Sequence, residues 1–137
     1  MSDGLLVAGQ KGILAKLSGD SALVALLGGT AKVYDSPPEN VAFPYIVIGD
    51  KTAIDFGSMT FRGQDQTLTI HSWSQAKSSL EVQQIMDRIW SVLHEGALTL
   101  VNATQVLLRS EFAQPFLDED GRTHHGVQRF RLLLKEG

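Results

Sequence analysis

Apolar residues recur every three or four positions in two parts of the chain, which is the spacing of an amphipathic helix. The first part predicts a helix over residues 5–17, and a Ser-Gly-Asp break at residues 18–20 separates it from a short helix over residues 21–27. The second part predicts the longest helix of the chain, over residues 74–94. Its apolar stripe is formed by Val82, Ile85, Ile89 and either Val92 or Leu93.

Alternation of apolar and polar residues predicts strands in the remaining segments. Prolines delimit the first two strands, because a proline cannot donate a hydrogen bond to a neighbouring strand. A loop that contains Pro115 and the acidic Asp-Gly turn at residues 118–121 is expected between the last two strands. The strands are expected at residues 32–35, 45–56, 65–73, 104–112 and 126–135.

This order of elements predicts one α+β domain over residues 1–137. We expect a mainly antiparallel sheet of four to five strands, with the N-terminal helix and one long central helix packed on one face. The length of the chain is sufficient for a single hydrophobic core without disulfides or metals. Its contents of 43% hydrophobic and 20% charged residues are typical of globular domains.

The last two predicted strands place charged residues on one face of the sheet. In the first of them, Val106, Leu108 and Phe112 are expected to point toward the helices. The alternating positions of both strands then form an uncovered face, which contacts solvent, a second subunit, or the lumen of an oligomer. The sequence leaves these three alternatives open. The charged residues of this face are Arg109, Glu111, Arg129 and Arg131.

Charge and cysteine content exclude several classes of function. The chain has no cysteine, which excludes disulfide scaffolds, thiolate metal sites and cysteine nucleophiles. Its 12 basic residues are outnumbered by 15 acidic ones, and the net charge of −3 argues against binding of nucleic acid over the whole surface. The first residues lack the pattern of a signal peptide, and no apolar run approaches the roughly 18 residues of a membrane span. We therefore expect synthesis in the cytoplasm and no membrane partner.

Histidines near the last predicted turn raise the question of a metal or catalytic site. Adjacent residues of a strand point to opposite faces, so His124 and His125 would not both reach one ion. His71 is expected to be a half-buried structural residue. No nucleophile motif accompanies these histidines, and we expect no catalytic residue, no cofactor and no metal site. The alternative is a small α+β binding module or an enzyme that uses the three histidines.

Four segments carry a likeness to a known family, and together they extend over nearly the whole chain. In chain order they are Val33-Tyr34-Asp35 with Pro37-Pro38, Phe43-Pro44-Tyr45-Ile46-Val47-Ile48-Gly49, Leu68-Thr69-Ile70-His71-Ser72-Trp73-Ser74, and Asp118-Glu119-Asp120-Gly121-Arg122-Thr123-His124-His125-Gly126-Val127 followed by Arg129-Phe130-Arg131. The chain resembles the small tail-completion proteins of long-tailed bacteriophages and gene transfer agents, which are related in fold to lambda-type tail terminators. Ser72 departs from the pattern, which would place an apolar residue there.

The resemblance implies a structural protein of virion assembly without catalytic residues. Members of this family assemble as rings, usually hexamers, on the end of the tail tube, where they stop its polymerisation and offer a surface to the head connector. The implied partners are other copies of the chain, the tail tube protein and the connector protein, and DNA passes through the lumen without specific binding. The implied location is the head–tail interface of the virion, after synthesis in the cytoplasm of the bacterial host.

A ring of identical subunits needs two different surface patches that match. Residues 54–62 are the leading candidate for one patch, because exposed apolar side chains in a connection between strands indicate a partner. The alternative is that these side chains fold back onto the core. The residues of this candidate patch are Ile54, Phe56, Met59, Phe61 and Arg62.

Overall fold

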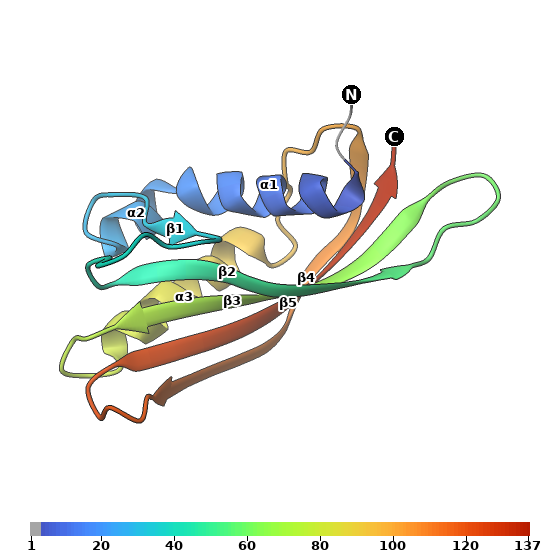
Figure 1. Cartoon of the computed structure of the whole chain (residues 1–137). Helices are drawn as coiled ribbons and strands as arrows, with labels where there is room; N and C mark the ends of the chain where they lie inside the picture. The colour runs from blue at the N-terminus through green and yellow to red at the C-terminus, as the bar shows by residue number, and fades with distance from the viewer. Residues whose placement is uncertain (1–3) are drawn as a thin grey trace.

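The computed structural model describes residues 4–137 and shows a five-stranded sheet with helices packed against one of its faces (Figure 1). The predicted α+β class is confirmed. In chain order the elements are α1 (Leu5–Ser18), α2 (Ser21–Leu26), β1 (Val33–Tyr34), β2 (Tyr45–Asp55), β3 (Gly63–Ser74), α3 (Leu80–Leu93), β4 (Ala103–Leu117) and β5 (His124–Glu136).

The sheet is mainly antiparallel, as predicted, and its strands lie in the order β1-β2-β3-β5-β4. β1 runs parallel to β2, and the other neighbouring pairs are antiparallel. β3 and β5 pair without interruption, from Gly63 opposite Lys135 to Ser74 opposite His124. β5 is therefore an interior strand, and β4 is at the edge of the sheet.

The hydrophobic core lies between the sheet and a single layer of helices. On the covered face of the sheet, Leu68, Ile70 and Phe130 are fully buried. The apolar stripe of α3 packs against this face, and Ile85 and Ile89 are also fully buried. Each such side chain contributes roughly 1.5–3 kcal/mol by its transfer out of water. The apolar residues of the predicted helical stripe and those of the predicted strands thus pack together in one core.

Buried glutamines connect each long helix to the sheet. The Gln66 amide in β3 donates a hydrogen bond of 2.9 Å to the carbonyl oxygen of Leu5 in α1. The Gln128 amide in β5 donates one of 3.0 Å to the carbonyl oxygen of Met86 in α3. Gly9 lets α1 approach the sheet closely, because a Cβ atom there would lie 2.5 Å from Gln66 Oε1. These polar contacts fix where each helix sits on the covered face.

The carboxylate of Asp20 connects α2 to α3. It accepts a hydrogen bond of 2.9 Å from the Leu23 amide and thereby caps α2. The Arg88 guanidinium donates two further hydrogen bonds of 2.7 Å to its two oxygens. The bonds from Arg88 are the main reason that the pKa of Asp20 lies below its usual value of 3.8. One residue therefore both starts α2 and positions it beside α3.

The central helix is shorter than predicted. α3 has 14 residues, as many as α1, and it begins at Leu80 and not at Ser74. The Ser74 hydroxyl accepts a hydrogen bond from the Ala76 amide and donates one to the Glu81 carboxylate. It therefore stabilises a turn ahead of the helix, and the residues after it do not continue the helical pattern. None of the described helices has the length and apolar content of a membrane span.

The strand β4 is longer than predicted. It continues through Pro115 to Leu117, where the sequence indicated a loop. Proline is tolerated in β4 because this strand is at the edge of the sheet, so one side of its backbone has no neighbouring strand to which an amide would donate. The acidic Asp-Gly turn follows directly, and Gly121 has the positive φ of 70° expected for such a turn.

Two β-bulges in β4 make one sequence prediction wrong. The pairing with β5 shifts after Gln105 and again after Ser110, which leaves Val106 and Glu111 as extra residues. Each bulge reverses the alternation of side chains. Leu108 is buried as predicted, but Val106 and Phe112 are 52% and 39% exposed and do not point toward the helices.

Candidate interaction surface

The face of the sheet opposite the helices, which we call the open face, is not covered by any other element within residues 4–137. Its side chains alternate with the buried ones along β3 and β5, and most of them are partly exposed. One end of this face carries five rings from four strands, the ring cluster. The ring cluster consists of Tyr45, His71, Trp73, Phe116 and His125.

The rings of this cluster pack on one another across the strands. The Trp73 ring is stacked between neighbours, at centroid distances of 5.2 Å to Tyr45 and 4.6 Å to His125. The ring of His71 lies 5.4 Å from that of Trp73, and the ring of Phe116 lies 4.7 Å from that of His125. Burial in this cluster raises the pKa of Tyr45 above its usual value of 10.0. The cluster forms a continuous, largely apolar surface without a covering layer.

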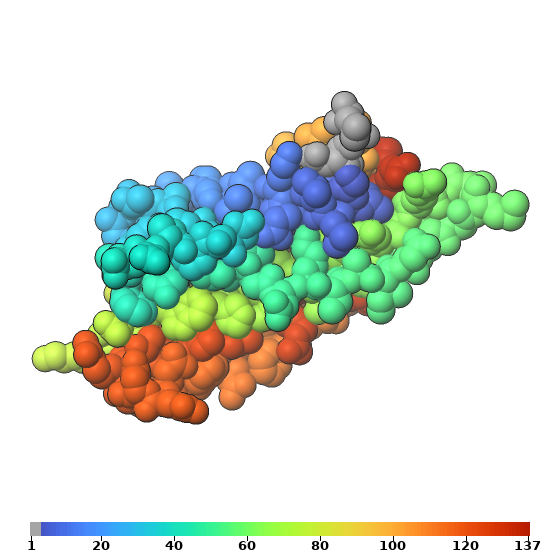
Figure 2. All heavy atoms as spheres, in the orientation of Figure 1, coloured from blue at the N-terminus to red at the C-terminus, as the bar shows by residue number. Residues whose placement is uncertain are grey.

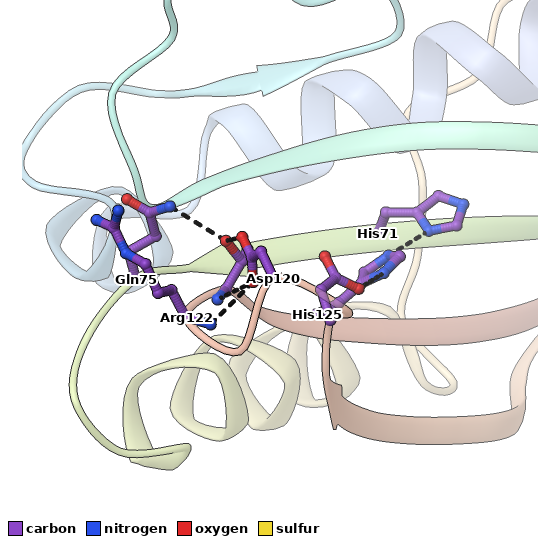
Figure 3. Close-up of polar contacts among 7 residues, drawn as sticks. His71, Gln75, Asp120, Arg122 and His125 are labelled. Carbon is purple, nitrogen blue, oxygen red and sulfur yellow. Dashed lines mark hydrogen bonds and ion pairs between the residues drawn. The ribbon is translucent and has the colours of Figure 1, made fainter.

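A row of polar contacts runs through the ring cluster, and Figure 3 shows its two histidines, His71 and His125. The His71 Nδ1 and His125 Nε2 atoms are 2.9 Å apart, and His125 Nδ1 lies 3.4 Å from Asp118 Oδ1. His124 pairs with Leu117 and His125 pairs with Phe116, so the two adjacent histidines lie on opposite faces as predicted. In the described part of the chain, no three His, Asp or Glu side chains converge as ligands of one metal ion.

The turn between β4 and β5 is closed by the Asp120 carboxylate (Figure 3). It accepts hydrogen bonds from the amides of Arg122 and Thr123, at 2.8 and 2.9 Å, and one of 2.6 Å from the Thr123 hydroxyl. The Thr123 hydroxyl bond is the largest cause of a pKa of about 2 for Asp120. Gln75 donates a hydrogen bond of 3.1 Å to the same hydroxyl. The Asp120 carboxylate thus stabilises the Asp-Gly turn that the sequence predicts.

Arginines dominate the middle of the open face. Arg131 donates hydrogen bonds to both oxygens of Asp65, with a shortest distance of 2.7 Å, and this contact holds the pKa of Asp65 below 3.8. Arg109 lies directly opposite Arg131 in the β4–β5 pairing. The Arg129 guanidinium lies 5.0 Å from the centre of the Phe112 ring. We call these four residues the arginine strip: Arg109, Phe112, Arg129 and Arg131.

The position of Glu111 differs from that of the three arginines with which it was grouped. It is an extra residue of the second β4 bulge, so the alternation rule does not assign it to the open face. Its charge is close enough to help raise the pKa of Arg131, after the larger effect of Asp65. The structure therefore brings Arg109, Arg129 and Arg131 together on one face, with Glu111 at its border.

Residues 54–62 form the end of the β2–β3 hairpin and project beyond the part of the sheet that helices cover (Figures 1 and 2). We call this segment the arm. Met59 is fully exposed, and Ile54 and Phe61 are 68% and 36% exposed. Phe56 instead packs inside the arm, over Gly63 and edge-on to the Phe61 ring at 5.9 Å. None of the arm residues belongs to the hydrophobic core of the described chain.

The rings of the open face were not identified as a site from the sequence. Tyr45, Trp73 and Phe116 are separated by tens of residues, and only the strand order brings them together. The sequence of β2 does contain a signal for an uncovered apolar surface. Tyr45 and Val47 occupy the positions that alternate with the buried residues, so they belong to the open face. Placing Phe116 beside them requires the extension of β4 through Pro115, which the sequence did not predict.

Comparison with known proteins identifies the family. Residues 11–135 match the sequence profile described as "Tail completion protein gp17". The chain belongs to this family. The resemblance read from the four sequence segments is thereby confirmed, and the chain has a structural role in phage tail assembly as a component of the virion.

Two individual matches agree with this assignment. The tail completion protein gp17 of Bacillus phage SPP1 is 30% identical over 103 residues, which cover 75% of this chain and 76% of that protein. A chain in the solved structure "Virion of native gene transfer agent (GTA) particle" superposes with a TM-score of 0.87. This likeness covers 98% of the present chain and 99% of the other, at 24% identity, and it shows that the two share a fold.

Proposed function

We propose that this tail completion protein closes the end of the tail tube as a ring, most simply a hexamer, and presents a surface to the head connector. The observation that carries the proposal is the presence of two different unpartnered surfaces on one chain, the projecting arm and the open face. A closed ring of identical subunits needs two unlike patches, because each subunit contacts its two neighbours through different surfaces.

The chemistry of the two surfaces supports a protein–protein contact. The arm presents Met59 and Ile54 as exposed apolar side chains, and aromatic rings of the kind found in the ring cluster are enriched in protein interfaces. Arg109 and Arg129 add cations that have no carboxylate within ion-pair distance among the described residues. These features favour subunit contact over a water-filled lumen for the ring-cluster end of the open face.

The charge distribution is compatible with transient passage of DNA through such a ring. The net charge of the chain is −3, and Arg131 is neutralised locally by Asp65. Binding of nucleic acid depends on the number of phosphates that basic residues neutralise, so a subunit with few unpaired arginines would not retain the duplex. We accordingly infer contact without specific binding of DNA.

The arm provides the first test of this proposal. Replacing Ile54 and Met59 together by serine should prevent ring formation without unfolding the protein, because both side chains are largely exposed. Light scattering after size exclusion and electron microscopy of the purified protein would measure the assembly. A matched control replaces Leu80 and Val101, which are 65% and 62% exposed outside the arm and the open face.

The same variants can be tested on tails, because a ring that forms only on the tube would be missed in solution. In a phage that lacks its own copy, the control variant should restore tails of uniform length. The Ile54→Ser, Met59→Ser variant should leave tubes of irregular length. Uniform tails with the arm variant would contradict the role of the arm, and uniform tails without any functional copy would contradict tube closure itself.

A further inference from the structure

The polar row of His71, His125 and Asp118 connects three parts of the fold on the open face. His71 belongs to β3, His125 to β5, and Asp118 to the turn that follows β4. The contacts are 2.9 Å between the two imidazoles and 3.4 Å between His125 Nδ1 and the carboxylate. Trp73 and Phe116 pack against the same imidazoles, so the row lies within apolar surroundings.

The positions of the protons follow from these distances. The negative charge of Asp118, 3.4 Å from His125 Nδ1, favours the tautomer of His125 that carries its proton on Nδ1. In neutral His125 the Nε2 atom then has a lone pair and accepts from the Nδ1 proton of His71. The hydrogen bond between the two imidazoles is therefore formed when both are neutral.

One additional proton fits the row, but a second does not. A proton that adds to His71 Nε2 leaves a single hydrogen between His71 Nδ1 and His125 Nε2. When this hydrogen moves to His125 Nε2, the positive charge lies on His125, whose Nδ1 atom is 3.4 Å from Asp118 Oδ1. A second additional proton would place hydrogens on both of these facing nitrogens, which lie only 2.9 Å apart. The hydrogen bond between the imidazoles would then be replaced by repulsion between two cations in a half-buried cluster.

We propose that His71 and His125 act as one unit that accepts a single proton, and that a second proton expels His71 from the ring cluster. The ring cluster is then an acid-sensitive part of the open face, intact near neutral pH and opened below it.

The groups around the row determine how the stability of the fold changes with pH. Burial and the neighbouring His125 lower the pKa of His71 below its usual value of 6.5, and Asp50 on β2 acts in the opposite direction. Asp118 faces His125 from the turn. The unfolded chain therefore binds a proton at His71 more readily than the folded chain does, so protonation of His71 destabilises the fold as the pH falls below 6.5 toward its folded pKa.

Histidine NMR titration of the full chain from pH 8 to 4.5, with EDTA present, tests the shared proton. The resonances of His71 and His125 should both move in a first step and both move again at least about one pH unit lower. In a His71→Gln variant the second step should be absent. In Asp118→Asn the first step should shift to lower pH, because the carboxylate no longer stabilises the cation. His124→Gln, on the other face, is the matched control and should retain both steps.

Trp73 fluorescence tests the opening of the cluster. In a Trp90→Phe background Trp73 is the remaining tryptophan, and its emission should change with the second step and lose that change in His71→Gln. Independent single-step titrations of the two histidines, each unaffected by replacement of the other, would overturn the shared proton. Trp73 emission that ignores the second step, or that changes equally without His71, would overturn the opening.

Discussion

Ser72 and Ser74 lie two positions apart on the covered face of β3, and both are fully buried. Their hydroxyls differ in their partners. Ser74 donates to Glu81 and accepts from the Ala76 amide, whereas Ser72 Oγ has no hydrogen-bond partner among the described residues. A buried hydroxyl without a partner retains its desolvation cost, so the departure of Ser72 from the apolar pattern of the family has an energetic consequence.

This pair of serines gives a matched prediction. Ser72→Ala should leave the free energy of unfolding unchanged or raise it by up to about 1 kcal/mol, because it removes an unsatisfied polar group. Ser74→Ala should lower it by about 1–2 kcal/mol, because it removes two hydrogen bonds of the turn before α3. Urea denaturation of the two variants would measure the difference. A larger loss for Ser72→Ala than for Ser74→Ala would show that the Ser72 hydroxyl has a partner.

At the residue scale, alternation predicted part of the candidate surface. It placed Arg109, Arg129 and Arg131 on the uncovered face. This was correct because side chains alternate between the two faces along β5, and because Arg109 lies opposite Arg131 in β4. It failed for Val106 and Phe112, because a single extra residue in a strand reverses the orientation of every residue after it. Neither bulge has a glycine or proline that would reveal it in the sequence.

At the scale of elements, the close packing of α1 on the sheet depends on Gly9. Alanine is about 1 kcal/mol more favourable than glycine inside a helix, so helix propensity alone favours replacement. The added Cβ would lie 2.5 Å from Gln66 Oε1 and 3.3 Å from Leu132 Cδ2. Gln66 is fully buried and its amide is bonded to the carbonyl of Leu5, so it cannot move away without losing that bond.

We therefore predict that Gly9→Ala lowers the free energy of unfolding by about 1–3 kcal/mol despite its helix propensity. Gly12→Ala is the matched control in the same helix. Its Cβ would meet the end of the Leu100 side chain at 2.8 Å, and this side chain is only partly buried and can rotate away. Thermal unfolding followed by circular dichroism should rank Gly9→Ala as the less stable variant. The reverse order would show that the Gln66 contact does not limit the approach of α1.

Element boundaries were less predictable than element types. The stripe of α3 was visible in the sequence, but its start was not, because Ser74 uses its hydroxyl to hold a turn and does not cap the helix. Pro115 indicated a loop, because a proline interrupts a strand that has neighbours on both sides. Whether a strand has one neighbour or two is decided by the order β3-β5-β4, which local patterns do not contain.

At the scale of the whole molecule, stability is unevenly distributed. β3 and β5 lie inside the sheet beneath the helices, whereas the arm lacks core contacts and has exposed side chains. Backbone amides exchange with solvent according to the free energy of local opening, which is small in such projecting segments. The backbone amides of the arm should therefore exchange faster than those of the strands next to it, although the two are continuous in the chain.

Hydrogen exchange measured by mass spectrometry should show this gradient. In the isolated subunit, peptides that contain residues 56–62 should exchange within seconds, and peptides from the middle of β5 should exchange last. In assembled particles the arm should become protected while β5 stays unchanged, if the arm is held against a neighbour. Protection of the arm in the isolated subunit equal to that of β5 would contradict its independence from the core.

The edge strand β4 has a consequence for growth beyond the ring. An exposed strand edge invites a strand of another molecule to add to it, and repetition of this step produces open-ended fibres. The outer edge of β4 is interrupted by its bulges at Val106 and Glu111 and by Pro115, which has no amide hydrogen. Only short stretches of regular backbone remain for another strand to align with. We therefore expect copies of this protein to contact one another through side chains. Aggregation by addition of strands to this edge of the sheet is disfavoured.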